Sequence, residues 1–571
     1  MGVEPLDIVK AVLMLIAGLG TFLIGLKVMG ENLETLAGDR LKVFFTKISD
    51  NRLLGIATGA VTTVLTQSST ATTVMVVGFV NTGVMTLLQA TAIIMGANIG
   101  TTITAYLIAL QKIPVAAAFS ALAGAGVFMQ MAKNNKVKNI GTIFTGVGML
   151  FIGLYVMSNS MSIVTVIKTA DGSGLLIREA ILRLAALPGA PIILLVFGAI
   201  LTIIVQSSAG TTAILVGLCS AGAMDLEPAL YITLGMNVGT CLTALVSSAG
   251  ATTNAKRASM IHLLFNVIGT IIFGIVLAAA GKYILQFITS IRIGSDEGTV
   301  ISMQIALFHT IFNVTTTIVL FPLMKQFTQL ASLIIPESKT KKVNPQDLIY
   351  KFKYLDDRFL STPSIAMAML RKEIFAMMED AQENLQLSVS AIMAKDLGRI
   401  EEFQNRETHI NFINKEITKY MVNISNLDIT YANEQEIAAY YHNVSDIERI
   451  GDYAENVIEY AQELIKAGVD FSEPCKEEIT DMTNAVYQEL NAVKIAFDSR
   501  SLKDYDEITA YEDLVDTYYN KLSENHIVRL NQGSCNAEAG SIFISLIGNL
   551  ERIGDHAMNV AKSMTNYLPL K

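Results

Sequence analysis

The chain has 571 residues, a formal net charge of −9 and 51% hydrophobic residues, with a mean hydropathy of +0.46. The acidic excess lies mainly in the C-terminal region and argues against nucleic acid as a partner. Asp, Glu, Lys, Arg and His are all missing from 53–111, 184–224 and 228–255. A membrane-spanning helix needs about 20 apolar residues, so these stretches predict an all-α, polytopic membrane protein with a soluble C-terminal domain.

The N-terminus predicts a permanent membrane helix. Residues 1–10 carry Glu4 and Asp7 where a cleavable signal would be basic, and the apolar run that follows ends near Met29. Loops with clustered Lys and Arg residues tend to be cytoplasmic. Such clusters occur in 133–138, at 256–257 and in 339–342, and we expect the C-terminal domain to be cytoplasmic.

Two polar motifs occur twice in the apolar region. Gln-Ser-Ser-x-x-Thr-Thr begins at Gln67 and again at Gln206, and Gly-x-Asn-x-Gly-Thr begins at Gly96 and again at Gly235. The two motifs repeat at the same offset, without a gap between them. Polar groups planted twice in apolar sequence predict a binding site assembled from two related halves, as in many secondary transporters.

The repeat extends upstream, because the segments beginning at Gly18 and Gly146 are similar at a slightly smaller offset. The difference between the two offsets predicts an eleven-residue insertion in the second copy, around 170–174. We place repeat 1 at about 8–132, repeat 2 at about 140–285 and a further helix at about 300–335. Small polar residues flank the Gln-Ser-Ser motifs and favour two re-entrant hairpins, because non-helical backbone at membrane depth must be buried or face a cavity. We therefore expect inverted repeats whose hairpin tips meet near the midplane.

An oxyanion could be held here without Lys or Arg. Helix N-termini bind anions, but each contributes only about 0.3 to 2 kcal/mol, so bound cations must supply further positive charge. Sodium suits hydroxyl and amide oxygens, and these segments lack the Asp, Glu or His relay typical of proton coupling. Candidate sodium ligands are Gln206, Ser207, Thr240 and Thr243, with Gln67, Thr101 and Thr104 in the first copy.

One alternative is that these small residues only pack helices together, as they often do in membranes. Two copies of both motifs at one constant offset favour a binding site instead. We assign His262 and His309 to helix packing through hydrogen bonds to backbone. An enzyme is disfavoured, because no nucleotide-binding loop is present and the membrane serines have no neighbouring acid or base to activate them.

The paired motifs resemble the sodium/phosphate cotransporter family over about 18–335. This resemblance implies an inverted-repeat transporter of the plasma membrane, the inner membrane in bacteria, that carries phosphate with sodium. It also implies that Ser68, Ser69, Ser207, Ser208, Asn98 and Asn237 approach phosphate. The first copy departs from the pattern, since 116–131 contains no His or Asn, and sodium stoichiometry and electrogenicity stay open.

After a linker at about 336–352, the region 353–571 shows helical periodicity and a second repeat. Glu-Arg-Ile-Gly-Asp begins at Glu448 and again at Glu551. This wide spacing leaves room for several long helices in each copy and predicts two three-helix bundles. The first and last residues of each motif share one helix face, so a cation should lie between them: a neighbouring Arg in a salt-bridged surface, or a metal. The metal candidates are Glu448, Asp452, Glu551 and Asp555, with Glu407 and Glu512 on preceding helices.

The duplicated acidic motif resembles the PhoU family over about 360–564, which implies a regulatory domain that binds metal clusters. Carboxylate ligands favour hard or mid-series ions. The four cysteines show no clustered spacing, so the sequence predicts neither a disulfide framework nor a zinc site. They are Cys219, Cys241, Cys475 and Cys535.

Together these features predict sodium-coupled phosphate transport by alternating access, with a cytoplasmic PhoU-like regulatory domain. A phosphate exporter, a carrier of another oxyanion and a membrane-anchored phosphate sensor are the alternatives. The expected partners are inorganic phosphate, sodium ions and the lipid bilayer. The direction of flux and a homodimeric state stay open.

Overall fold

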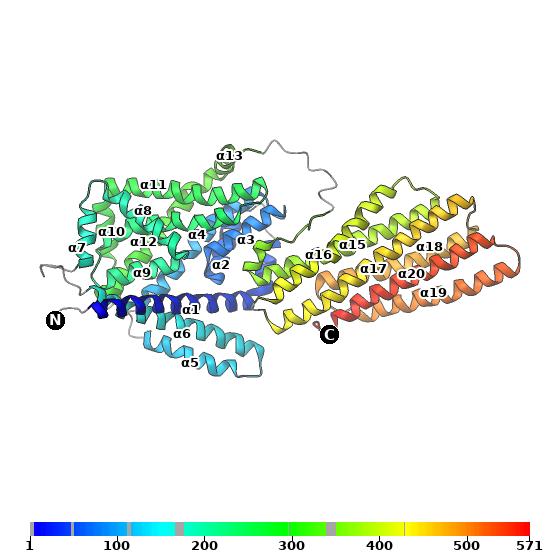
Figure 1. The fold of residues 1–571 in the computed structure, drawn as a ribbon, viewed down its shortest axis with the longest axis horizontal. Helices are drawn as coiled ribbons and strands as arrows, with labels where there is room; N and C mark the ends of the chain where they lie inside the picture. Colours follow the sequence, from blue (N-terminus) through cyan, green and yellow to red (C-terminus); the bar gives the residue numbers. More distant parts are fainter. Residues whose placement is uncertain are drawn as a thin grey trace. The chain divides into compact units, whose positions relative to one another are not determined.

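The structure is a computed structural model that describes residues 5–46, 51–110, 116–165, 176–294, 296–337, 350–427 and 429–570. Every regular element in these ranges is a helix (Figure 1), which confirms the all-α fold. The chain forms two compact units, Met1–Ser338 and Lys339–Lys571. The insertion expected at 170–174 and most of the expected linker lie outside the described residues.

Unit 1 contains helices of two lengths. Six described segments are long and apolar enough to cross a membrane, and they lie in α1, α4, α6, α10, α11 and α12–α13, whereas α2, α3, α5, α8 and α9 contain shorter apolar helices. The bounds are α1 (Pro5–Thr46), α2 (Arg52–Thr66), α3 (Ser69–Asn81), α4 (Leu87–Ala109), α5 (Ala116–Gln130), α6 (Asn135–Thr165), α7 (Leu176–Ala185), α8 (Ala190–Val205), α9 (Ser208–Ser220), α10 (Leu226–Ser247), α11 (Thr253–Ser290), α12 (Glu297–Leu320), η2 (Phe321–Leu323) and α13 (Met324–Ile334).

Helices α1 and α6 pack tightly through glycines. A Cβ atom added to Gly18 would lie 2.8 Å from the backbone nitrogen of Met157, and one added to Gly146 would lie 2.6 Å from that of Met29. The contacts run in opposite directions along the two helices, so α1 and α6 are antiparallel. Gly146 is the counterpart of Gly18 in the sequence repeat, and Met157 is the counterpart of Met29. The two contacts are therefore equivalent, with the roles of α1 and α6 exchanged.

The pairs α2–α4 and α8–α10 repeat a second close contact. A Cβ atom on Gly96 would lie 1.9 Å from the carbonyl oxygen of Ile56, and one on Gly235 would lie 1.9 Å from that of Leu195. Both residues of the second contact follow their counterparts at the offset of the repeated motifs. The sequence repeat is therefore a structural repeat, held in register by glycines that let two backbones touch.

Large apolar side chains remain exposed on the outer helices of unit 1. Examples are Ile200 and Ile204 on α8 and Ile271 and Ile275 on α11. An apolar surface of this kind is rare on soluble monomers and suits contact with lipid chains.

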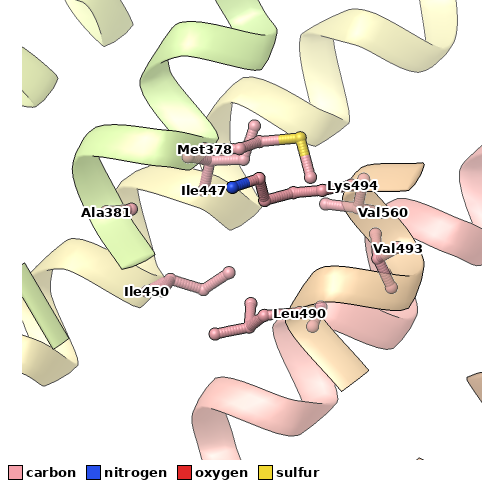
Figure 2. A pocket seen from close by; sticks show the side chains of 9 residues that line it. Met378, Ala381, Ile447, Ile450, Leu490, Val493, Lys494 and Val560 are labelled. Carbon is pink, nitrogen blue, oxygen red and sulfur yellow. The ribbon is translucent and has the colours of Figure 1, made fainter. Parts of the chain in front are cut away.

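The six long helices of unit 2 form two three-helix bundles. Helices α15, α16 and α17 contact one another, as do α18, α19 and α20, and the bundles join through α17 with α20 and α15 with α18. Figure 2 shows the apolar side chains of Met378, Ile447, Ile450 and Leu490 where the bundles meet. The elements are η3 (Asp357–Ser361), α15 (Pro363–Ala394), α16 (Ile400–Ser425), α17 (Tyr431–Ala467), α18 (Glu473–Ser499), α19 (Tyr505–Asn531) and α20 (Ala537–Met564).

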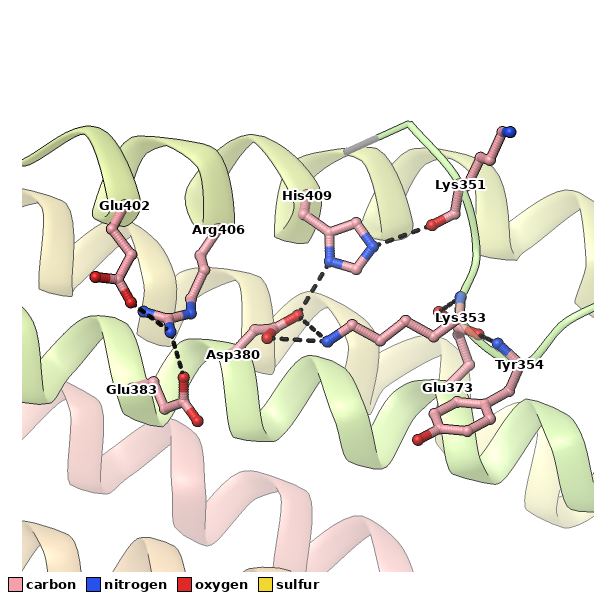
Figure 3. A network of polar contacts seen from close by, with 9 residues as sticks. All are labelled: Lys351, Lys353, Tyr354, Glu373, Asp380, Glu383, Glu402, Arg406 and His409. Atoms are coloured by element: carbon pink, nitrogen blue, oxygen red, sulfur yellow. Dashed lines mark hydrogen bonds and ion pairs between the residues drawn. The ribbon is translucent and has the colours of Figure 1, made fainter. Parts of the chain in front are cut away.

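The non-helical segment 350–356 is fixed to the first bundle by buried polar groups (Figure 3). The fully buried carboxylate of Glu373 accepts hydrogen bonds from the backbone N–H groups of residues 353–355, at 2.6 to 3.2 Å. Asp380 accepts from Lys353 Nζ at 2.9 Å and contacts His409 Nδ1 at 3.0 Å. These contacts continue to the region before 353, because His409 Nε2 donates to the carbonyl oxygen of Lys351 at 3.1 Å.

Candidate functional site

The two Gln-Ser junctions share one unusual backbone geometry. Gln67 ends α2 with φ 53° and ψ 23°, and Gln206 ends α8 with φ 54° and ψ 23°. Left-handed backbone costs a residue other than glycine about 1 to 2 kcal/mol, and such strain tends to gather at functional sites. The same residue type carries it in both repeats.

Each junction opens a new helix whose first turn is capped by serine. Ser68 Oγ accepts a hydrogen bond from the backbone N–H of Ala71, and Ser207 Oγ accepts one from that of Gly210, both at 3.1 Å. A hydroxyl that accepts in this way can still donate its own proton. The starts of α3 and α9 therefore combine a helix N-terminus with a serine O–H, which is a suitable arrangement for an anion.

The chain turns back on itself at the first junction. Thr63 Oγ1 donates to Thr72 Oγ1 at 3.1 Å, although continuous helix would separate these positions by about 13.5 Å. Helices α8 and α9 also contact each other at the second junction. Both Gln-Ser-Ser motifs thus join two short helices that pack together.

The two repeats cross at the motifs. Helix α3 contacts α10, and α9 contacts α4, so each Gln-Ser-Ser helix touches the helix that carries the Gly-x-Asn-x-Gly-Thr motif of the other repeat. Sequence similarity between repeats could not give this pairing, because it contains no information on which copy touches which.

The expected sodium ligands are engaged differently in the two copies. In the first copy, Thr104 Oγ1 donates to Gln67 Oε1 at 3.0 Å, which joins the junction to α4. In the second, Gln206 and Thr243 are both exposed, and no hydrogen bond joins them in the described part of unit 1. The oxygens of the second copy are therefore the more available ones.

The hydroxyl protons of the remaining threonine candidates are used in hydrogen bonds within their own helix, so only the oxygen lone pairs are free for a ligand. Thr101 Oγ1 donates to the carbonyl oxygen of Ala97 at 3.1 Å, and Thr240 Oγ1 donates to that of Met236 at 2.9 Å. A hydroxyl whose proton is used in this way can still offer its oxygen to a cation.

The two motif asparagines are buried and hold the same orientation. Asn98 Nδ2 donates to the carbonyl oxygen of Ile94 at 2.8 Å, and Asn237 Nδ2 donates to that of Thr233 at 2.9 Å. Each amide keeps its second N–H for another partner. The expected phosphate candidates Ser69 and Ser208 stand at the first position of α3 and α9.

One histidine belongs to this site, which sequence reasoning missed. His309 Nε2 lies 3.2 Å from Asn237 Oδ1, so its described side-chain contact is a motif residue and not the backbone group we expected. A signal was available: Asn follows His by four residues at both His262 and His309, and in each pair the Asn amide donates to the His carbonyl at 3.0 Å.

In the first bundle of unit 2, three carboxylates converge. Oxygen atoms of Glu407, Asp452 and Glu455 lie within 4.8 Å of one another. Burial and then Glu455 raise the pKa of Glu407 to about 7. Glu455 was missed by sequence reasoning although it lies three residues after Asp452, and Glu448 stands outside this group of three.

The second bundle holds a more deeply buried acid. Glu489 is 0% exposed, and neither carboxylate oxygen has a hydrogen-bond partner among the described residues. Burial and then Glu512, Asp555 and Asp516 raise its pKa to about 9. Glu489 and Asp516 were also missed; Glu489 stands on α18 where α15 of the first bundle has Asn384, so the acidic motif alone gave no signal for it.

The glycine of each Glu-Arg-Ile-Gly-Asp motif makes room for these acids. A Cβ atom on Gly451 would lie 2.9 Å from Glu407 Oε2, and one on Gly554 would lie 2.9 Å from Glu489 Oε2. Both motif helices therefore receive a buried carboxylate from a neighbouring helix. An unpartnered buried carboxylate beside further acids fits a hard cation with oxygen ligands.

Family comparisons agree with this division of the chain. Residues 21–159 and 177–294 match the model of the Na+/Pi-cotransporter family, and residues 374–461 and 479–564 match the PhoU domain. Unit 1 thus carries a match to a phosphate transporter family, the Na+/Pi-cotransporters, and unit 2 carries two matches to the PhoU domain.

Individual relatives cover different parts of the chain. YjbB of Escherichia coli strain K12, which is named for inorganic phosphate export, is 22% identical over 95% of both chains. YqeW of Bacillus subtilis is 29% identical over 55% of this chain and 95% of its own. Human sodium-dependent phosphate transport protein 2B is 37% identical over 20% of this chain and 17% of its own. No solved structure matches.

Proposed function

We propose that the protein couples inorganic phosphate transport to sodium through a site built from both repeats. The observation that carries this proposal is the pair of Gln-Ser junctions with matching left-handed geometry at Gln67 and Gln206. Each precedes a serine-capped helix that contacts the other repeat. Phosphate would bind at the starts of α3 and α9, through the hydroxyls of residues 68–69 and 207–208 and the amides of Asn98 and Asn237.

Sodium would bind mainly in the second copy. Gln206 and Thr243 are exposed there, and Ser207 and Thr240 lie close to them along the chain. In the first copy, Gln67 and Thr104 are already joined by a hydrogen bond. While this hydrogen bond is formed, we expect the pair to hold α2 against α4 and not to bind sodium.

Alternating access would use the symmetry of the fold. The antiparallel contact of α1 with α6 is what an inverted repeat requires, and α2–α3 and α8–α9 are short enough to form re-entrant hairpins. The hairpins would move against the α1–α6 scaffold. Unit 2 would lie in the cytoplasm, with unit 1 in the plasma membrane.

Labelled phosphate flux into proteoliposomes with an imposed sodium gradient tests the proposal. Gln206→Gly removes the side-chain amide but accommodates a left-handed backbone, so it should fold normally and lose sodium-dependent flux by at least about tenfold, the loss of one oriented ligand. Gln206→Asn, which tolerates left-handed backbone and keeps an amide, should retain more flux.

Thr328→Val on α13 is a control that removes a hydroxyl outside the site. It should leave the flux unchanged. Flux that ignores sodium in the intact protein, or that survives in Gln206→Gly, would contradict sodium coupling at this site.

Phosphate export is the second candidate, because the match to YjbB covers 95% of both chains. The site chemistry is the same in either direction, so only the imposed gradients distinguish them. Phosphate efflux from loaded vesicles without any response to sodium would favour export.

We further propose that the acidic clusters of unit 2 bind metal ions and make this unit regulatory. Glu407, Asp452 and Glu455 would hold one ion or cluster, and Glu489 with Glu512, Asp516, Glu551 and Asp555 another. A bound divalent ion would offset the mutual repulsion of these carboxylates, and Glu489 would lose its proton on binding.

Mn²⁺ binding to the purified full-length protein, followed by electron paramagnetic resonance, tests this second proposal. Glu489→Gln is nearly isosteric and should weaken binding at the second bundle by at least about tenfold. Glu463→Gln removes an exposed carboxylate and should leave binding intact. Equal Mn²⁺ affinity in the two variants would refute the role of Glu489.

A further inference from the structure

A cavity lined by two cysteines lies at one end of the second bundle, and none of its lining residues belongs to the proposed transport site. It measures about 180 Å³ and is lined by Cys475 and Cys535 together with Asp470, Ser472, Ser534 and Asn536. Cys475 lies in the first turn of α18, and Cys535 directly precedes the residue that caps α20. Because α18 and α20 begin at the same end of their bundle, two cysteines far apart in the sequence share one cavity.

A third donor stands beside Cys535. His526 on α19 places Nδ1 3.9 Å from Cys535 Sγ. A sulfur and a nitrogen ligand on one tetrahedral zinc ion lie about 3.6 Å apart, given metal–ligand distances of about 2.3 and 2.05 Å. The pair is therefore close to ligand spacing.

The fold holds this imidazole in place. A Cβ atom on Gly540 would lie 2.7 Å from His526 Cε1 and 3.5 Å from Cys535 Sγ, so α20 uses glycine where the two donors meet. The ring of His526 packs on Phe543 with centroids 5.3 Å apart. Burial and then Arg529 lower the pKa of His526, which favours the neutral imidazole that binds metals.

Cys475 contributes from another wall of the cavity. Its side chain is 2% exposed, and its thiol accepts a hydrogen bond from Ser472 Oγ at 3.2 Å. The three donor atoms do not yet lie within 4.8 Å of one another in the described structure. Binding of one cation by all three donors would require Cys475 to move toward the other two.

We propose that Cys475, Cys535 and His526 form a binding site for a thiophilic divalent cation such as Zn²⁺. Two sulfur donors and one imidazole select such an ion, whereas the all-carboxylate clusters of the same unit suit harder ions. On binding, both thiols release their protons to solvent and two metal–sulfur bonds form.

A nucleophilic role fits this pair less well than metal binding. Burial, together with Cys475, raises the pKa of the Cys535 thiol, and Arg529 only partly opposes this rise. This shift disfavours the stabilised thiolate that a reactive cysteine needs.

Cd²⁺ titration of the reduced, full-length protein in detergent tests the site. Cd²⁺ bound to thiolates gives an ultraviolet charge-transfer band that carboxylate ligands do not give, so the acidic clusters do not interfere. We expect Cd²⁺ to produce the band and to protect Cys535, the more exposed of the two thiols, from alkylation. Zn²⁺ should compete for the same site.

Variants locate the site and keep the test independent of folding. Cys475→Ser and Cys535→Ser should each remove at least half of the band, and His526→Gln should weaken Cd²⁺ binding by at least about tenfold. Cys219→Ser and Cys241→Ser, which remove the buried thiols of unit 1, should leave it unchanged. Helical circular dichroism confirms that each variant is folded.

Two results would overturn the proposal. One is a missing band in the intact protein, or a full band in a folded Cys475→Ser variant. The other is a Cys475–Cys535 disulfide in protein isolated from reducing cells. Either result leaves the transport assay unaffected, so this inference and the proposed function fail separately.

Discussion

Glutamine is an unusual choice for left-handed backbone, where glycine and asparagine are favoured. Gln67 and Gln206 nevertheless share nearly the same φ, at 53° and 54°. The sequence identified both residues as site candidates from their repeated motif. It did not predict the strain, because left-handed geometry at glutamine arises from the packing of the two helices that meet there and not from local propensity.

Asp380 helps to anchor segment 350–356 through its contacts with Lys353 and His409. Burial opposes its ionisation, but hydrogen bonds from His409 and Lys353 hold its pKa below the usual range. A depressed pKa in the folded state adds stability at pH above the unfolded value of about 3.9, and this stability is lost as pH falls through the folded value.

We therefore expect Asp380→Asn to lower the stability of unit 2 at neutral pH by about 1 to 3 kcal/mol. The difference from the intact protein should shrink as the pH is lowered below about 4, because Asp380 is protonated in the unfolded state before it is protonated in the folded state. Thermal unfolding followed by circular dichroism across this range measures it. Asp481→Asn, at an exposed position of α18, is the control, and a difference that grows toward acid would contradict the role of Asp380.

At the scale of elements, the repeat could be predicted and its three-dimensional pairing could not. A constant offset between the two copies of both motifs already implied two copies of one helix arrangement. The contacts of α3 with α10 and of α9 with α4 depend on how the two copies pack against each other. Sequence similarity between the copies does not predict this packing. For the same reason, the sequence did not predict that Cys475 and Cys535 line one cavity. Their wide spacing in the sequence matches no metal-binding motif.

Glycines allow the close helix contacts of α2 with α4 and of α8 with α10. Gly235→Ala would bring a Cβ atom to 1.9 Å from a backbone carbonyl oxygen, which cannot rotate aside as a side chain would. Overpacking typically costs about 1 to 3 kcal/mol, and we expect the upper end here. Gly96→Ala should behave alike, because its contact is the same in the first copy.

A thiol-reactive fluorogenic dye suits the measurement in a Cys475→Ser, Cys535→Ser background, since the remaining Cys219 and Cys241 are buried in unit 1 and react only on unfolding. Gly274→Ala is the matched control, because a Cβ atom there meets nothing within 4 Å. An equal melting temperature in Gly235→Ala and Gly274→Ala would show that the repeated helix contact is looser than the structure describes.

At the scale of the whole molecule, composition alone separated an apolar N-terminal unit from an acidic helical C-terminal unit. The sequence identified the acidic motifs as candidate metal ligands but missed Glu489, Asp516 and Glu455. These residues lie near the motifs only because the helices of each bundle pack together. It also placed the start of the C-terminal domain near 353, whereas the aromatic rings of Tyr350 and Phe352 already pack against Phe412. A single sequence does not predict which side chains meet through tertiary contacts.

The two compact units of the chain should fold independently. Unit 2 satisfies its own buried polar groups at its start: Glu373 accepts from residues 353–355, and Tyr420 donates to the carbonyl oxygen of Asp356 at 3.1 Å. We therefore expect residues 350–571 expressed alone to be soluble and helical and to unfold in one cooperative transition. A fragment that begins at 357 lacks these contacts and should unfold at a lower temperature.

The complementary fragment 1–337 should retain phosphate flux, because every candidate ligand of the transport site lies within it. If unit 2 is regulatory, the rate of this fragment should differ from that of the full chain, and the sign of the difference assigns inhibition or activation. Flux assays in parallel proteoliposomes decide the matter. Identical rates at all phosphate and divalent-ion concentrations would exclude regulation by unit 2, and a folded fragment without flux would make unit 2 part of the transport machinery itself.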